Sequence, residues 1–257
     1  MSAELNQQYR LQLSQLHWSF WVGVGFFVAV IVGVFTLAWY LTETMSAEES
    51  VPVTSIVISG EMNYTIQQDI EAAIETVNLG NFFTVDVNAV QTQVSALPWV
   101  YSVSVRKKWP NELKIYVVDQ TPVALWNGDF LINQQGKAFQ ADITRVRHEL
   151  PALYGPEGSE NVALKRYQDF NRLLDYASLS IDELVLSERY SWQLILNDGV
   201  TLNLGREKSV ERIQRFMDIY PEIKAHKKEA EQVDYVDLRY DTGLAVGWKP
   251  QDMKERA

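Results

Sequence analysis

Cysteine is absent from the 257 residues of this chain, and histidine occurs only three times, at His17, His148 and His226. Without a thiol, the chain has no disulfide, no cysteine nucleophile and no thiolate-bound zinc or iron–sulfur site. The three histidines stand far apart in the sequence and show none of the spacings typical of a metal site. The sequence therefore predicts neither a cofactor nor a bound metal.

Positive charge is scarce, because 23 Lys and Arg residues stand against 33 Asp and Glu residues, which gives a formal charge of −10 at pH 7. A protein that binds nucleic acid gathers lysines and arginines on one face, where they release counterions from the phosphates. The short basic clusters at residues 106–108 and 227–228 are more typical of solvated surfaces. The composition therefore argues against a nucleic-acid partner.

Charged residues are missing altogether from residues 18–42, "WSFWVGVGFFVAVIVGVFTLAWYLT". About 20 apolar residues are enough to cross the hydrocarbon core, and tryptophan or tyrosine stands near both ends of this run. A cleaved signal peptide has a shorter apolar region, of about 7 to 15 residues, so we predict an uncleaved transmembrane helix. Arg10 and His17 precede the helix and acidic residues follow it, which favours a cytoplasmic tail at residues 1–17.

The next part of the chain, after an acidic linker at residues 43–50, predicts a small α+β domain at residues 51–120. "VPVTSIVISG" is typical of a strand that ends at Gly60. Two amphipathic helices follow, the first with Thr65 and Gln68 as a capping box and the second with Asp86 as its cap. The strands "VYSVSVRKKW" and "ELKIYVVD" then flank a turn. The order β-α-α-β-β predicts a three-stranded sheet with both helices on one face, and it resembles the polypeptide-transport-associated (POTRA) domain.

Residues 121–250 predict a C-terminal β-rich domain, followed by a tail at residues 251–257. Short alternating strands are separated by turns, among them a hairpin turn at residues 197–199. Helical patterns occur at residues 161–178 and from a cap at Ser209 to a stop at Pro221. We expect the helices to pack on one side of a mostly antiparallel sheet.

The stretch "VDYVDLRYDTGLAVGW", residues 233–248, predicts two final strands joined by a turn at residues 241–243. We expect alternating faces in both strands, with Val236, Leu238 and Tyr240 opposite Tyr235, Asp237 and Arg239, and then Leu244, Val246 and Trp248. The sequence predicts an exposed sheet edge here, to which another protein could add a strand. The alternative is a closing hairpin whose aromatic side chains fill the core.

The residues assemble no catalytic site. Pairs such as Asp182-Glu183 and Glu48-Glu49 are expected by chance among 33 acidic residues. "GPEGSE", residues 155–160, lacks the strand–turn–helix context of a nucleophile elbow and is interpreted as a polar surface loop. A membrane-anchored envelope hydrolase or transferase that uses carboxylates or one of Ser159 and His148 stays an alternative, as does a POTRA protein that handles unfolded polypeptides.

Four stretches, at residues 97–126, 202–206, 215–221 and 235–248, closely resemble the FtsQ/DivIB family of bacterial cell-division proteins, and the resemblance covers essentially the whole chain. It implies an essential, non-enzymatic scaffold of the inner membrane with its bulk in the periplasm and enrichment at the septum. It also implies binding to FtsB, FtsL and other division proteins, no small-molecule substrate, and a role in linking early and late division proteins to control septal peptidoglycan synthesis.

The resemblance assigns FtsB binding to the terminal strands, where Tyr240, Gly243 and Trp248 match the family's partner-binding stretch. Leu238 belongs to the same strand. We add Arg189, expected on a nearby strand, as a residue that could pair with an acidic side chain of the partner.

Overall fold

The computed structural model describes residues 18–46, 52–226 and 231–250. Its first element is helix α2 (Trp18–Ser46), whose residues from Phe20 to Thr44 have a mean hydropathy of 2.4. The helix continues four residues past the predicted end at Thr42. The hydroxyls of Thr42 and Thr44 donate to the carbonyls of Trp39 and Tyr40, at 2.8 and 2.7 Å, so these polar residues fit within the last helical turns.

The first soluble elements follow the predicted order: β1 (Ser55–Glu61), α3 (Gln67–Glu75), α4 (Val87–Ser95), β2 (Val100–Lys108) and β3 (Glu112–Asp119). The three strands form one sheet in the order β1-β3-β2. In the central strand β3, Leu113, Ile115 and Val117 are fully buried, while the residues between them are more exposed. This alternation is the expected result when one face of a sheet is covered and the other is not.

Two local predictions in this region are wrong. Gly60 does not end β1 but lies inside it, one residue before Glu61. The position needs glycine, because its φ is +139° and a Cβ there would stand 1.8 Å from the carbonyl oxygen of Val117. Thr65 does not form a capping box with Gln68. Its hydroxyl donates to Asp119 at 2.6 Å, and the other oxygen of that carboxylate accepts the backbone N–H groups of residues 63–65 at 2.7 to 2.9 Å.

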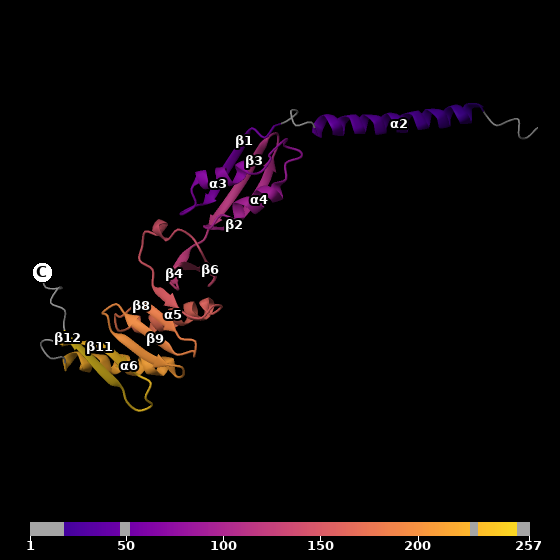
Figure 1. The fold of residues 1–257 in the computed structure, drawn as a ribbon. Helices are drawn as coiled ribbons and strands as arrows, with labels where there is room; N and C mark the ends of the chain where they lie inside the picture. Colours follow the sequence, from indigo (N-terminus) through magenta and orange to yellow (C-terminus); the bar gives the residue numbers. More distant parts are fainter. Residues whose placement is uncertain (1–17, 47–51, 227–230, 251–257) are drawn as a thin grey trace, which may run out of the picture. The chain divides into compact units, whose positions relative to one another are not determined.

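The rest of the chain builds one nine-stranded sheet in the order β12-β11-β10-β9-β8-β7-β4-β5-β6 (Figure 1). Its strands are β4 (Pro122–Trp126), β5 (Phe130–Asn133), β6 (Ala138–Phe139), β7 (Ala152–Tyr154), β8 (Ile181–Leu186), β9 (Trp192–Leu196), β10 (Thr201–Gly205), β11 (Glu231–Asp237) and β12 (Ala245–Pro250). Five of the neighbouring pairs are antiparallel and three are parallel, so the prediction of a mostly antiparallel sheet is confirmed.

Helices α5 (Glu160–Asp175) and α6 (Ser209–Ala225) supply two of the parallel connections, from β7 to β8 and from β10 to β11. They contact each other, so they cover the same face of the sheet, as expected. Phe170, Leu174, Ile213 and Phe216 are fully buried members of the core that the two helices share with the sheet.

The predicted limits of α6 are wrong at both ends. Lys208 is the N-cap, in a left-handed conformation, and Ser209 is the first helical residue. Pro221 does not stop the helix, which continues to Ala225. A proline inside a helix removes one backbone hydrogen bond, but the following turn carries Ile223, which is 7 % exposed and belongs to the core. Burial of Ile223 therefore keeps the last turn helical.

Candidate functional site

Strand β12 forms an open edge of the nine-stranded sheet. It pairs antiparallel with β11 through Val236↔Val246 and Asp237↔Ala245, and no other described strand flanks its outer side. Figure 1 shows β11 and β12 side by side at the yellow end of the chain. An edge strand presents backbone N–H and C=O groups that have no ladder partner, and a strand of another protein can pair with them.

Aromatic side chains are exposed around this edge. Tyr240 is 56 % exposed, Tyr235 42 % and Trp248 37 %, whereas Leu244 and Val246 pack partly against the core. The ring of Tyr235 lies across Gly247, where a Cβ would come within 2.1 Å of its Cε1 atom. Exposed aromatic rings beside an open edge are typical of protein interfaces, because they offer a large apolar area at a small entropic cost.

Two arginines of α6 hold the segment that leads from β11 towards β12. The Arg215 guanidinium donates to the carbonyls of Leu238, Tyr240 and Asp241, at 3.0, 2.9 and 2.8 Å. Arg212 donates to Leu204 at 2.5 Å and to Arg239 at 3.0 Å. A guanidinium offers five donors in a rigid fork, so a single side chain can fix several carbonyls at once. We call Arg212 and Arg215 the arginine clamp.

An ion pair inside the same segment adds to this order. Arg239 donates through Nη2 to Asp237 at 2.6 Å and through Nε at 2.9 Å, and the Asp237 residue is 6 % exposed. The hydrogen bonds from Arg239 lower the pKa of Asp237, although burial acts in the opposite direction. The same hydrogen bonds raise the pKa of Arg239. The pair therefore stays ionised at neutral pH and ties the end of β11 to the residue before Tyr240.

The structure places the predicted site residues of the terminal strands at different depths. Tyr240 and Trp248 lie exposed at the edge, and Gly243 has open space where a side chain would begin. Leu238 is fully buried in the core, so it supports the segment from below. Tyr240 lies beyond the end of β11 at Asp237, so the predicted alternation through residue 240 is wrong. The Tyr240 carbonyl accepts from Arg215.

Arg189 does not lie on a strand. It is exposed in the turn between β8 and β9, and the nearer of these strands, β9, is separated from β12 by β10 and β11. The register nevertheless brings this turn, the end of β11 and the start of β12 to the same end of the sheet. At roughly 4.8 Å between neighbouring strands, about 15 Å of sheet separates β9 from β12.

Arg212, Arg215 and Tyr235 were not among the site residues predicted from the sequence. The two arginines are three residues apart on a predicted helix, so their shared face could be expected from the sequence. Their acceptors could not, because those carbonyls lie 8 to 27 residues away along the chain.

Ser159 and His148, the two side chains named for a catalytic alternative, do not line the same cavity. Ser159 is 6 % exposed, so the predicted surface loop is partly buried, and its hydroxyl donates to the carbonyl of Pro156 at 2.5 Å. His148, Asp182 and Glu183 line a cavity of about 590 Å³ from which Ser159 is absent. Among the described residues, no group of three or more His, Asp or Glu side chains could hold a metal ion.

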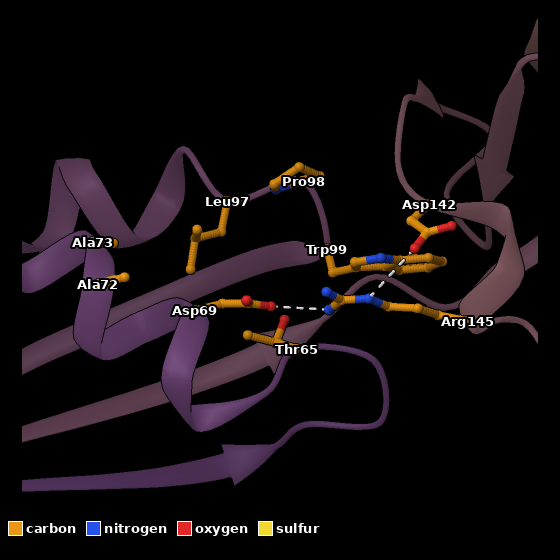
Figure 2. Close-up of a pocket in the computed structure, with 9 residues that line it drawn as sticks. All are labelled: Thr65, Asp69, Ala72, Ala73, Leu97, Pro98, Trp99, Asp142 and Arg145. Atoms are coloured by element: carbon orange, nitrogen blue, oxygen red, sulfur yellow. Dashed lines mark hydrogen bonds and ion pairs between the residues drawn. The ribbon is translucent and has the colours of Figure 1, made fainter.

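A second cavity, of about 460 Å³, is lined mainly by apolar side chains and by one ion-paired arginine (Figure 2). Arg145 donates to Asp69 at 2.9 Å and to the carbonyl of Tyr64 at 2.8 Å, alongside the ring of Trp99. Trp99 stacks on Tyr64 with ring centroids 4.4 Å apart. Asp142 also faces Arg145, at 4.0 Å, so two carboxylates surround one guanidinium and the arrangement is typical of a structural tie.

Comparisons with known proteins agree over nearly the whole chain. Residues 51–120 match the model of the POTRA domain, FtsQ-type, and residues 124–239 match that of the cell division protein FtsQ/DivIB, C-terminal. The chain is 37 % identical to the cell division protein FtsQ of Shewanella oneidensis, over 98 % of this chain and 95 % of that protein. It is 38 % identical to the proteins of the same name from Escherichia coli and Vibrio cholerae, over 91 % and 89 % of this chain and 86 % and 87 % of those proteins.

Proposed function

Because the chain belongs to the FtsQ/DivIB family of cell-division proteins, we propose that it is a single-pass scaffold of the bacterial division machinery. In this proposal α2 crosses the inner membrane, residues 1–17 are cytoplasmic, and the remaining bulk lies in the periplasm and gathers at the septum. The protein binds FtsB and FtsL, links early to late division proteins and controls septal peptidoglycan synthesis through its surfaces, without a catalytic step of its own.

The observation that carries the proposal is the open edge at β12 with exposed aromatic residues beside it. We propose that FtsB adds a strand to this edge. Backbone hydrogen bonds along β12 supply affinity, and Tyr240 and Trp248 supply specificity as side-chain anchors. Gly243 leaves room for the partner's backbone, and Leu238 supports the segment from the core.

Arg189 has a more distant role in this proposal. Its turn lies at the same end of the sheet as Tyr240, so a partner chain that continues past the edge strand would cross towards it. An acidic side chain in that part of the partner would meet the guanidinium. Since Arg189 is exposed, we expect the pair to affect the association rate more than the final affinity.

The alternatives have less support. A closing hairpin would bury its aromatic side chains, but Tyr235, Tyr240 and Trp248 are all at least 37 % exposed. An envelope hydrolase would need its nucleophile and base together, whereas Ser159 does not line the cavity that holds His148. The POTRA domain at residues 51–120 is compatible with a protein that handles unfolded polypeptides. The single helical anchor found among the described residues favours a place in the inner membrane for such a protein.

The test is a binding titration of the full chain in lipid nanodiscs with the periplasmic segment of FtsB. We expect Tyr240→Ala to weaken binding by about thirtyfold, which corresponds to roughly 2 kcal/mol for an interface anchor, with an unchanged melting temperature. Tyr176→Ala is the matched control, because Tyr176 is 84 % exposed at the end of α5. Unchanged affinity of Tyr240→Ala would contradict strand addition at this edge.

A further inference from the structure

One end of the first soluble module surrounds the point at which the chain arrives from α2. Pro52 forms an isolated bridge with Asn81, and the N–H of Thr54 donates to the carbonyl of Asn111 at 3.2 Å. The loop after Asn81 and the tip of the β2–β3 hairpin therefore flank the incoming chain. We call Phe83, Lys107, Lys108 and Trp109 the membrane-proximal tip.

The tip is aromatic and basic at once. Trp109 is 77 % exposed and Phe83 is 41 % exposed. Lys107 joins them, since its Nζ donates to the carbonyl of Phe83 at 2.9 Å and lies 5.8 Å from the ring centroid of Phe82. Arg106 and Lys108 are exposed next to it.

The one acidic group at the hairpin tip, Glu112, does not cancel this charge; the linker at residues 43–50 carries separate acidic residues, Glu43, Glu48 and Glu49. Glu112 faces Lys108 at 3.2 Å and Lys114 at 4.0 Å, so a single carboxylate is shared by two ammonium groups. Arg106 and Lys107 add two further positive charges on the same hairpin. The tip is therefore a positive region of a chain whose formal charge is −10.

Covalent geometry keeps Pro52, which the tip flanks, close to the end of α2. Helix α2 ends at Ser46, and six residue steps lead from there to Pro52. A fully extended chain covers at most about 3.6 Å per residue, so Pro52 lies within about 22 Å of the helix end. This bound holds for every orientation of the module, because it depends on the chain length alone.

We propose that the membrane-proximal tip rests on the bilayer surface, with Trp109 in the headgroup layer and the basic side chains on anionic phospholipids. Tryptophan favours the membrane–water interface, where its ring is buried and its N–H stays hydrated. Lysine and arginine close to an anionic surface are attracted within a Debye length of about 8 Å. The contact restricts the tilt of the module above the membrane, and it depends on α2 as the anchor but on no protein partner.

The absence of cysteine allows a direct test with one label per molecule. A spin label on Thr84→Cys, next to Phe83, is compared with one on Tyr176→Cys in the full chain in nanodiscs. The discs contain phosphatidylcholine alone or with about one third phosphatidylglycerol, and the measured quantity is the ratio of collisions with oxygen to collisions with a water-soluble nickel chelate.

We expect the ratio at Thr84→Cys to be at least about twofold higher than at Tyr176→Cys in the anionic discs, and lower in discs without anionic lipid. Adding Trp109→Ala should lower it towards the control value, and an unchanged melting temperature shows that this variant folds. Equal ratios at both positions, or no effect of Trp109→Ala, would overturn the proposal. A higher collision ratio at Thr84→Cys that appears only when solubilised division proteins are added would also overturn the proposal, since the tip would then be a protein interface.

Discussion

At the scale of single residues, Tyr220 shows how one hydroxyl joins two elements. Its O–H donates to Asp198 at 2.5 Å, which ties α6 to the β9–β10 turn, and Lys224 contacts both Asp198 at 3.3 Å and the Tyr220 ring at 4.4 Å. Burial, followed by the Asp198 carboxylate, raises the pKa of Tyr220 well above its usual range. The hydroxyl therefore keeps its proton in the folded protein when an unfolded tyrosine would lose it.

This linkage predicts a loss of stability in alkali. Above about pH 10 the unfolded chain releases the Tyr220 proton and the folded chain retains it, so the free energy of unfolding falls as the pH rises. We expect Tyr220→Phe to lower that free energy by about 1 kcal/mol at neutral pH and to reduce its decline in alkali. Thermal unfolding of the full chain across this range measures both effects, with Tyr176→Phe as the exposed control. The same slope in Tyr220→Phe would contradict the role of the hydroxyl.

At the scale of elements, the arginine clamp determines how α6 contributes to the candidate site. Arg215 fixes three carbonyls between residues 238 and 241, immediately before the edge strand. Burial of Leu238, the bond from Arg212 to the Arg239 carbonyl and the Arg239–Asp237 pair restrain the start of the segment, whereas Arg215 reaches further, to the carbonyls of Tyr240 and Asp241. The order of the site therefore depends on a helix that contributes no exposed side chain to the proposed contact.

We expect Arg215→Ala to speed amide hydrogen exchange in residues 239–247 and to weaken FtsB binding by about tenfold, because ordering the segment then opposes binding. Arg215→Lys should restore only part of the protection, since one ammonium cannot reproduce the fork of a guanidinium. Arg172→Ala, on the exposed side of α5, is the matched control. The exchange measurement needs no partner, so it tests the clamp even if FtsB binds elsewhere. Unchanged exchange in Arg215→Ala would show that the clamp orders nothing.

The module at residues 51–119 allows a second prediction at this scale. We propose that this POTRA domain offers an edge strand or a helix groove to other envelope proteins, so we expect its deletion to impair recruitment to the septum while α2 and the C-terminal strands are kept. Fluorescence microscopy of dividing cells measures this. The deletion also removes Asp69 and Tyr64, both of which Arg145 contacts, so Arg145→Ala in the full chain is the control for the loss of the contacts that Arg145 makes. Normal septal localisation of the deletion variant would refute the prediction.

At the scale of the whole molecule, the anchor divides the chain between two compartments. We expect a cysteine introduced as Tyr176→Cys to react with a membrane-impermeant maleimide in intact spheroplasts, while Gln8→Cys reacts only after lysis. The unsubstituted chain is not labelled by the maleimide in either experiment, because it has no cysteine. Labelling of Gln8→Cys in intact spheroplasts would reverse the proposed orientation.

The sequence by itself determined the features that depend on neighbouring residues. The uncharged run of α2, the order β-α-α-β-β and the turn at residues 197–199 were predicted correctly, because hydrophobic periodicity and turn residues act over a few positions. The resemblance of residues 235–248 to a known family directed attention to the terminal strands. The structure places them at one edge of the sheet.

Only the tertiary structure decided the features that depend on residues distant in sequence. Pro221 stays in the helix because Ile223 is buried. Gly60 lies inside β1, where β3 passes too close for a side chain. Asp119, which is 54 residues from Thr65, accepts the hydrogen bond that replaces the expected capping box. The carbonyls that Arg215 holds lie 23 to 26 residues along the chain. Each outcome is a competition between a local preference of about 1 to 3 kcal/mol and long-range packing or hydrogen bonding, and local sequence patterns report only the first of these.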